Sequence, residues 1–203
     1  MILRRTIVAA LAAMAATSSL AQQAGKTPGG AVSPDQEYIR QSLTASSLSL
    51  AISRIAAQKA QTDDLKEFAQ LEESEQETLA DVLKSLSVQN ASFSDRSVRR
   101  PGDAEVEQHL DLRGRQVLEK LRAEGAGAEF DRDYMGALAT GHLELLRIQD
   151  AYLDSGQNNV NIINVAKLTR NMIKEHLQLL TDVESGMETA SGATVGAAPG
   201  KDR

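Results

Sequence analysis

The sequence predicts an all-α fold, an antiparallel four-helix bundle with an additional short helix. Apolar residues recur at alternating steps of three and four over several long segments, which is the spacing of one helix face. Glycine, proline and asparagine gather in a few places and do not recur every eight to twelve or so residues, as the turns of an all-β chain would. Short connections join the first two and the last two long segments, and such connections place helices antiparallel.

Composition narrows the class of protein. The 203 residues are 41% hydrophobic and 25% charged, enough for one domain with a real core. A net charge of −6 and the absence of an aromatic-interleaved basic run argue against a nucleic-acid partner. The chain has no cysteine, which excludes disulfides, a thiolate nucleophile and a cysteine-ligated metal.

The first 21 residues have the pattern of a secretory signal peptide. Arg4 and Arg5 form a positively charged n-region, residues 7–16 form a continuous apolar h-region, and small residues precede a cleavage position near Ala21. An apolar run this short cannot cross a bilayer, so we expect a periplasmic protein with no transmembrane segment after cleavage. The arginine pair leaves the export route open between the Sec and twin-arginine systems. Residues 22–33, rich in Gly and Gln, are expected to be a flexible leader.

The bundle domain is predicted over residues 34–184. Ser33-Pro34-Asp35-Gln36 is a strong helix start, with serine as N-cap, proline at the first position and glutamine completing a capping box. This first helix should reach about residue 60, and its many serines and alanines would let neighbouring helices come close. Thr62 and the two acids after it should begin a second helix that ends near residue 86.

The second helix has an interrupted apolar stripe. Leucine and phenylalanine occupy the stripe at its beginning and leucines at its end, but Glu72, Glu75 and Gln76 hold the middle. After a polar loop, a shorter helix is expected over about 103–124, a long helix over 127–154, and a last helix over about 160–184. The segment 185–203 lacks periodicity and is expected to be a disordered tail.

Several stretches resemble a known family. They are Ala-Gln-Lys-Ala at 57–60, Leu65 to Gln70, Gly127-x-x-Phe130-Asp131-x-x-Tyr134-Met135, His142, and Thr169 to Leu177. Together they resemble the exported, ferritin-like family called domain of unknown function 4142, from Gram-negative envelopes. The resemblance implies a ferritin-like fold. The family usually has Met-Val-x-Asp-His in two helices and a proline in the last, whereas this chain has Gln76, Gly141 and Asn171 at those points.

A ferritin-type di-iron site is not expected. Such a site needs a Glu-x-x-His pair on each of two helices. Ala139 and Ile173 stand three positions before His142 and His176, and neither can ligate a metal. Counting residues outward from the last turn places the two histidines roughly 7 Å apart along the bundle axis, too far for one ion unless the helices are staggered. Each histidine is therefore expected to be hydrogen-bonded on its own, within the core or at its edge.

The interrupted stripe leads to a different hypothesis. The same counting through the first turn places Gln76 opposite Ser46, and Glu72 beside Ser49. We therefore expect a polar patch inside or along the bundle, consisting of Ser46, Ser49, Glu72, Glu75, Gln76, His142 and His176. The alternative is that the second helix turns its acids toward water.

The sequence leaves the function open between three classes. It contains no Gly-x-Ser-x-Gly elbow, phosphate loop or nucleotide fingerprint, so a non-enzymatic protein without a cofactor is expected, either associated with an envelope partner or self-associating. The principal alternative is a protein that binds or oxidises a transition metal through an unconventional Glu/Gln/His site. The third class is a binder of a small cationic or apolar ligand in the bundle core.

Overall fold

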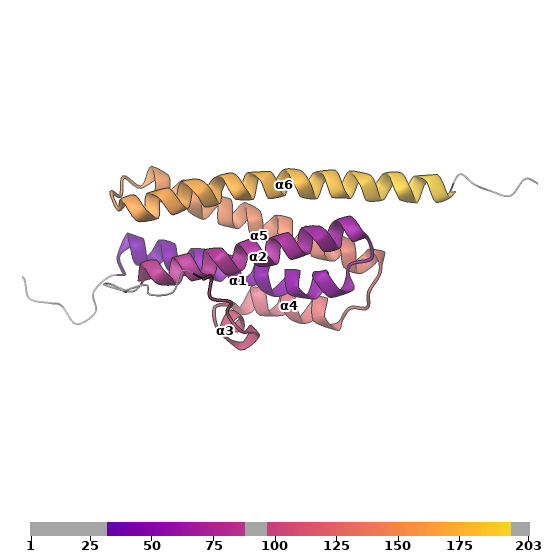
Figure 1. The fold of residues 1–203 in the computed structure, drawn as a ribbon, viewed down its shortest axis with the longest axis horizontal. Coiled ribbons are helices and arrows are strands. Elements are labelled where there is room, and N and C mark those ends of the chain that lie inside the picture. Colours follow the sequence, from indigo (N-terminus) through magenta and orange to yellow (C-terminus); the bar gives the residue numbers. More distant parts are fainter. Residues whose placement is uncertain (1–31, 88–96, 196–203) are drawn as a thin grey trace, which may run out of the picture. The chain divides into compact units, whose positions relative to one another are not determined.

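The computed structural model describes residues 32–87 and 97–195, and every regular element in these ranges is a helix. The helices are α1 (Pro34–Lys59), α2 (Asp63–Ser87), α3 (Asp103–Gln108), α4 (Leu112–Ala123), α5 (Ala128–Asp154) and α6 (Val160–Val195) (Figure 1). The predicted all-α fold is confirmed, while the finer likeness to ferritins stays a prediction. The predicted signal peptide, residues 22–31 of the leader and residues 196–203 of the tail lie outside the described residues.

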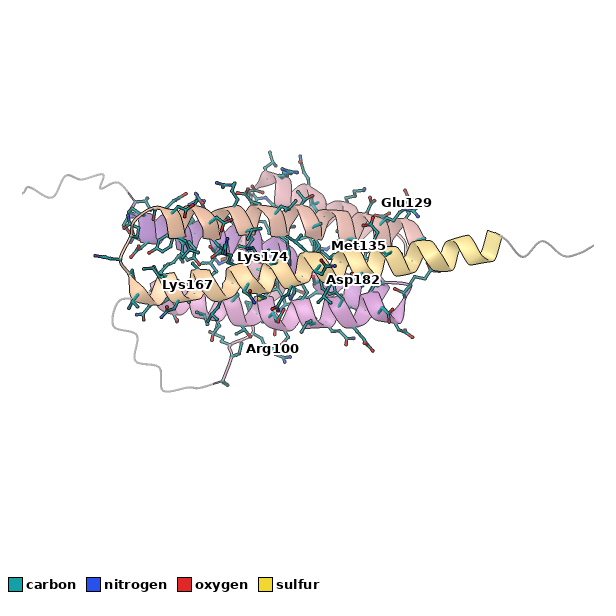
Figure 2. All side chains as sticks on the ribbon, turned by 90° about the horizontal axis from the view of Figure 1, so that it is seen from above. Arg100, Glu129, Met135, Lys167, Lys174 and Asp182 are labelled. Atoms are coloured by element: carbon teal, nitrogen blue, oxygen red, sulfur yellow. The ribbon has the colours of Figure 1, made fainter. Side chains whose placement is uncertain are left out.

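The long helices α1, α2, α5 and α6 form the bundle. α1 packs on both α2 and α5, α5 packs on α6, and α6 also touches α2, so α6 runs along the face between α5 and α2 (Figure 2). The predicted helix starts are present. Ser33 and Gln36 form the reciprocal capping box, and the Thr62 hydroxyl accepts a hydrogen bond from the Leu65 amide at 3.3 Å. Within the described ranges no helix is both long and apolar enough to span a bilayer.

The single short helix predicted over 103–124 is wrong, because the chain breaks there into α3 and α4. At the break Leu110 turns into the core, and Asp111 becomes the N-cap of α4. The Asp111 carboxylate accepts a hydrogen bond from the Gly114 amide at 2.7 Å. An aspartate that bonds locally in this way competes with a continuous helix, which explains the interruption.

The disordered tail predicted from residue 185 is also wrong over its first part. α6 continues to Val195, some eleven residues beyond the predicted end. The reason lies in packing, because Met187 continues the stripe of Leu180 and Val183 and contacts the same core cluster. That contact holds the helix in register past Glu184.

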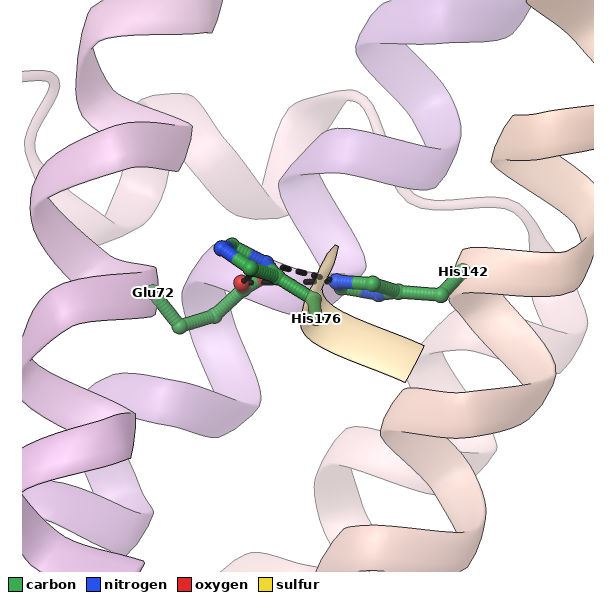
Figure 3. A group of neighbouring side chains, drawn as sticks. All are labelled: Glu72, His142 and His176. Carbon is green, nitrogen blue, oxygen red and sulfur yellow. Dashed lines mark hydrogen bonds and ion pairs between the residues drawn. The ribbon is translucent and has the colours of Figure 1, made fainter. Parts of the chain in front are cut away.

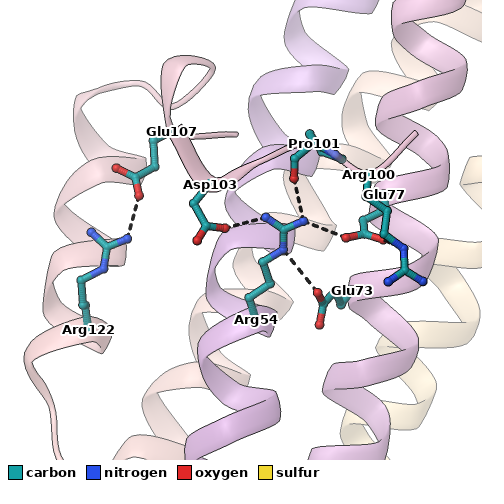
Figure 4. A network of polar contacts seen from close by, with 8 residues as sticks. All are labelled: Arg54, Glu73, Glu77, Arg100, Pro101, Asp103, Glu107 and Arg122. Atoms are coloured by element: carbon teal, nitrogen blue, oxygen red, sulfur yellow. Dashed lines mark hydrogen bonds and ion pairs between the residues drawn. The ribbon is translucent and has the colours of Figure 1, made fainter. Parts of the chain in front are cut away.

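An arginine near the C-terminal end of α1 attaches the segment that leads into α3. The Arg54 guanidinium binds Glu77 of α2 at 2.7 Å and Asp103 of α3 at 2.6 Å, and donates to the Pro101 carbonyl at 2.9 Å (Figure 4). Arg100 reaches the same Glu77 carboxylate at 3.2 Å. Arg100 therefore helps to hold this segment against α2.

The core consists of two apolar clusters with a polar layer between them. One cluster includes Leu50, Leu65 and Leu138, and the other includes Leu43, Leu83 and Leu145. Along each long helix the side chains pass from one cluster through buried polar residues to the other. The interruption that the sequence shows in the second helix thus occurs at one level in all four long helices.

Candidate metal centre

The polar layer receives buried side chains from every long helix. Its members, each at most 2% exposed, are Ser46 and Ser49 from α1, Glu72 and Gln76 from α2, His142 from α5 and His176 from α6. The predicted pairing across the first turn is confirmed, since the Ser46 hydroxyl donates to the Gln76 side-chain oxygen at 2.6 Å. The alternative in which the acids of α2 face water is wrong for Glu72, which is 0% exposed.

Three of these residues converge on one point. Glu72, His142 and His176 each offer one ligand atom, and the three atoms lie within 4.8 Å of one another. Glu72 Oε2 is 2.7 Å from His176 Nδ1 and 3.4 Å from His142 Nε2, and the two nitrogens are 3.1 Å apart (Figure 3). Figure 3 shows the side chains reaching this point from three different helices.

The expectation that the two histidines lie too far apart is wrong, and the reason is the direction of the side chains. In any α-helix the Cα–Cβ bond leans toward the N-terminus. Because α5 and α6 are antiparallel, His142 leans toward the level of His176, and His176 leans back toward the level of His142. The axial offset that counting residues gives is closed by the two imidazoles, whose ring centroids are 5.3 Å apart.

A second carboxylate holds the far side of His176. Glu75 Oε2 lies 2.5 Å from His176 Nε2, while Nδ1 of the same ring faces Glu72 and His142. The Phe68 ring meets His176 edge-on, with centroids 5.6 Å apart. Glu75 is the partly exposed member, with 34% of its side chain accessible, so it links the buried cluster to the surface of α2.

Electrostatics within the cluster shift two pKa values in opposite directions. Burial alone would raise the pKa of the Glu72 carboxyl, but the imidazoles of His142 and His176 outweigh burial and hold that pKa below its usual range. Burial would lower the pKa of His176, but Glu72 and Glu75 raise it to about 9. Without a ligand, the His176 imidazole is therefore protonated at neutral pH, and it lies between the carboxylates of Glu72 and Glu75.

Several buried polar atoms of the layer lack hydrogen-bond partners. Both oxygens of Glu72 are among them, since Oε1 has no hydrogen-bond partner and Oε2 meets the two imidazoles in ion-pair contacts only. The others at this site are Ser49 Oγ, Gln76 Nε2, His142 Nδ1 and Oε2 of the neighbouring Glu75, whose contact with His176 is likewise an ion pair. Unsatisfied buried polar atoms typically cost 1–3 kcal/mol or so each, so their concentration at one level calls for an explanation beyond folding.

Comparison with known proteins gives a family but no activity. The family model described as "Domain of unknown function (DUF4142)" matches residues 12–183. The chain belongs to this family. No curated protein and no solved structure matches the chain.

The donor set of this DUF4142 domain suits one transition-metal ion. Two imidazole nitrogens and one carboxylate oxygen form a common protein site for such ions. A tetrahedral ion with bonds of roughly 2.05 Å separates its ligand atoms by about 3.3 Å, and the three distances here are 2.7, 3.1 and 3.4 Å. The di-iron arrangement does not fit, because Ala139 and Ile173 stand where its additional glutamates would be needed.

Sequence reasoning missed one neighbour of the cluster. The Tyr134 hydroxyl lies 2.9 Å from the Ser53 hydroxyl, and both residues are fully buried. Burial raises the pKa of Tyr134, and the negative charge of Glu72 raises it further. The sequence pattern identifies Tyr134 only as part of the Gly127–Met135 stretch that carries the family resemblance, and nothing in its spacing distinguishes a buried hydroxyl from a solvated one.

Proposed function

We propose that this DUF4142 domain binds one divalent transition-metal ion, with Glu72, His142 and His176 as its protein ligands. The observation that carries the proposal is the convergence of three metal-binding atoms, from three helices, within 4.8 Å and out of contact with water. Three protein ligands leave at least one coordination position for a further group. The bound ion would supply an electrophilic centre inside the bundle.

Charge balance supports a divalent ion. With both imidazoles neutral, the carboxylates of Glu72 and Glu75 carry two negative charges, which a doubly charged cation neutralises. In the metal-free protein the proton on His176 supplies part of this compensation. The ion would therefore replace a proton, and the buried site would stay close to neutral.

Glu75 would act on the ion through His176. Metal-binding histidines usually present their second ring nitrogen to a carboxylate, which fixes the tautomer and the ring orientation. The contact of 2.5 Å between Glu75 and Nε2 has this arrangement and leaves Nδ1 directed at the other two ligands. Glu75 is accordingly proposed as a positioning residue, with Glu72, His142 and His176 as the ligands.

Metal content tests the proposal directly. Mature, untagged protein purified without chelator, then loaded separately with Zn²⁺, Co²⁺, Fe²⁺, Cu²⁺ or Mn²⁺ and desalted, should retain about one ion per chain for at least one of these metals, as measured by plasma mass spectrometry. Glu72→Gln, His142→Ala and His176→Ala should each lose it. His109→Ala, at the half-buried histidine outside the layer, and Glu67→Gln, at an exposed acid of α2, should retain it.

Two results would contradict the proposal. One is a metal content well below one per chain under every loading condition in protein that circular dichroism shows to be folded. The other is stoichiometric metal that survives in His142→Ala and His176→Ala. The bound Co²⁺ form adds a spectroscopic check, since its visible absorption reports nitrogen and oxygen ligation and should disappear in the same variants.

The place of action proposed for the domain is the periplasm, after export and cleavage near Ala21. The support is the charged, apolar and small-residue pattern of residues 1–21. N-terminal sequencing of protein recovered from osmotic-shock fluid should begin close to Gln22. Recovery of the uncleaved chain from the cytoplasm alone would contradict export.

A further inference from the structure

A groove of about 840 Å³ runs along α1 and α5 beyond the start of α4. Its floor is apolar or small and consists of Ala45, Leu48, Val117, Ala137, Gly141 and Ile148. Leu143, which also lines it, is 58% exposed. The groove is separate from the polar layer in its lining, because none of the three proposed metal ligands contributes to it.

The other half of the α1–α5 face already holds a helix. α4 packs on both α1 and α5, and its Leu118 and Leu121, each 1% exposed, join the core cluster there. Lys59 of α1 secures the end of α4 by donating to three backbone carbonyls, those of Leu121, Arg122 and Glu124. α4 has 12 residues whereas α1 has 26, so it covers less than half of the face. Helices α1 and α5 form the walls of the open half, as they do of the half that holds α4.

The size of the open half fits two turns of helix. From Arg40 to Leu48 along α1 the groove is about 12 Å long. A helix cylinder of that length and roughly 10 Å diameter occupies about 940 Å³, close to the volume of the groove. A short helix could therefore lie there in line with α4.

The rim of the groove is positively charged, in contrast to the acidic chain as a whole. Arg40, Arg113 and Arg147 line it, against the acids Asp111 and Glu144. Arg40 and Arg147 pair with acids of their own helices but remain 61% exposed. Arg113 makes no hydrogen bond or short ion pair with any other described residue, and it acts on Glu144 only at longer range, where it adds to the larger effect of Arg147 in lowering the pKa of that carboxyl. Asp111 caps α4. The lining therefore has three arginines against two acids, and Arg113 is the arginine without a short-range partner among the described residues.

We propose that the open half of the α1–α5 groove binds a short amphipathic helix of a partner protein. The apolar stripe of that helix would lie on the floor, and carboxylates beside the stripe would meet Arg113 and its two neighbouring arginines. Helix-in-groove binding of this kind places residues at steps of three and four on the apolar floor, as α4 does in the other half. The proposal does not depend on metal binding.

Synthetic peptides test the proposal with the mature chain. The first probe is a capped peptide of roughly 14 residues with a leucine stripe at helical spacing, flanking glutamates and one tryptophan. The second replaces the glutamates by lysines, and the third scrambles the stripe. Because the chain contains no tryptophan, peptide fluorescence reports binding without background. The acidic peptide should bind saturably, and the other two should bind at least about tenfold more weakly.

Variants locate the binding site. Ala137→Phe fills the floor and should abolish binding of the acidic peptide, and Arg113→Glu should weaken it about tenfold. Arg115→Glu is the matched control, because it makes the same charge change at another exposed residue of α4 outside the groove, and it should leave binding within about twofold.

Four outcomes would overturn the proposal. They are equal binding of the acidic and basic peptides, an equal effect of Arg115→Glu, saturable binding of dodecanoate with no peptide binding, and self-association in sedimentation that Ala137→Phe abolishes. The third would make the groove a site for a small amphiphile, and the fourth would make it an interface between two copies of the chain.

Discussion

Replacing Glu72 by leucine in the metal-free protein should change stability by an amount that depends strongly on pH. Glu72 is the only carboxylate in contact with both buried histidines of the described chain. His176 has a pKa of about 9 in the folded protein, above its ordinary value of 6.5, because Glu72 and Glu75 outweigh its burial. A raised pKa of this kind stabilises the folded state fully below pH 6.5, and the contribution is lost as the pH rises through 9.

The magnitude follows from the size of that shift. Moving a pKa from 6.5 to about 9 corresponds to about 3 kcal/mol, which Glu72 shares with Glu75. Near pH 6, Glu72→Leu should therefore destabilise the protein by about 2 kcal/mol. Near pH 9.5, His176 is largely neutral in both proteins, and leucine removes a carboxylate whose oxygens accept no hydrogen bond. The difference should then fall to about zero or become a small gain in stability.

Urea unfolding followed by circular dichroism, with EDTA present, measures this difference at both pH values. Glu67→Leu is the matched control, because Glu67 is exposed on the same helix and its replacement should change stability by no more than about 0.5 kcal/mol. An equal loss of stability at both pH values would refute the ion-pair argument. A clear gain near pH 6 would show that the buried acid is a net cost even when His176 is charged.

Two further substitutions and one truncation test other contacts of the fold. Ser46→Ala should cost about 1–3 kcal/mol by leaving Gln76 without its partner, and adding Gln76→Leu should recover part of that loss in a double-mutant cycle by urea unfolding. Arg54→Met should cost about 2–4 kcal/mol because Glu77, 4% exposed, loses its 2.7 Å partner, and hydrogen exchange of α3 should accelerate. A chain ending at residue 184 should lose about 1 kcal/mol in urea through removal of Met187, whereas one ending at residue 188 should not.

The fold was largely predictable because its determinants are local. The capping box at Ser33 and the cap at Thr62 need only neighbouring residues, and both are present. The break between α3 and α4 was not predicted, because the sequence alone does not show whether Asp111 caps a helix or lies within one. The extension of α6 was missed because its composition suggests disorder, and only the contact of Met187 with the core reveals the helix.

The candidate site was predictable in its members but not in its geometry. The interrupted stripe of α2 identified Glu72 and Gln76, and counting through a short turn gave the right partner, Ser46. The same counting failed for His142 and His176, because it compares the positions of the Cα atoms along the bundle axis. Long side chains extend away from that position, toward the N-terminus of their own helix. An axial offset of roughly 7 Å between antiparallel helices can bring such side chains together, because each leans toward the other.

The polar layer is costly for the fold, which is the physical reason for assigning it a function. A continuous apolar core would join the two clusters that the layer now separates, and replacing a buried charge cluster by packed apolar residues is often neutral or stabilising. Register alone would require one polar pair, such as that of Ser46 and Gln76, and not an acid and two histidines as well. The additional groups are residue types that bind metals, and they come from three helices. Neither oxygen of Glu72 takes part in a hydrogen bond of regular geometry. A cation at their centre satisfies all of these features with one ligand, whereas folding alone explains only their burial.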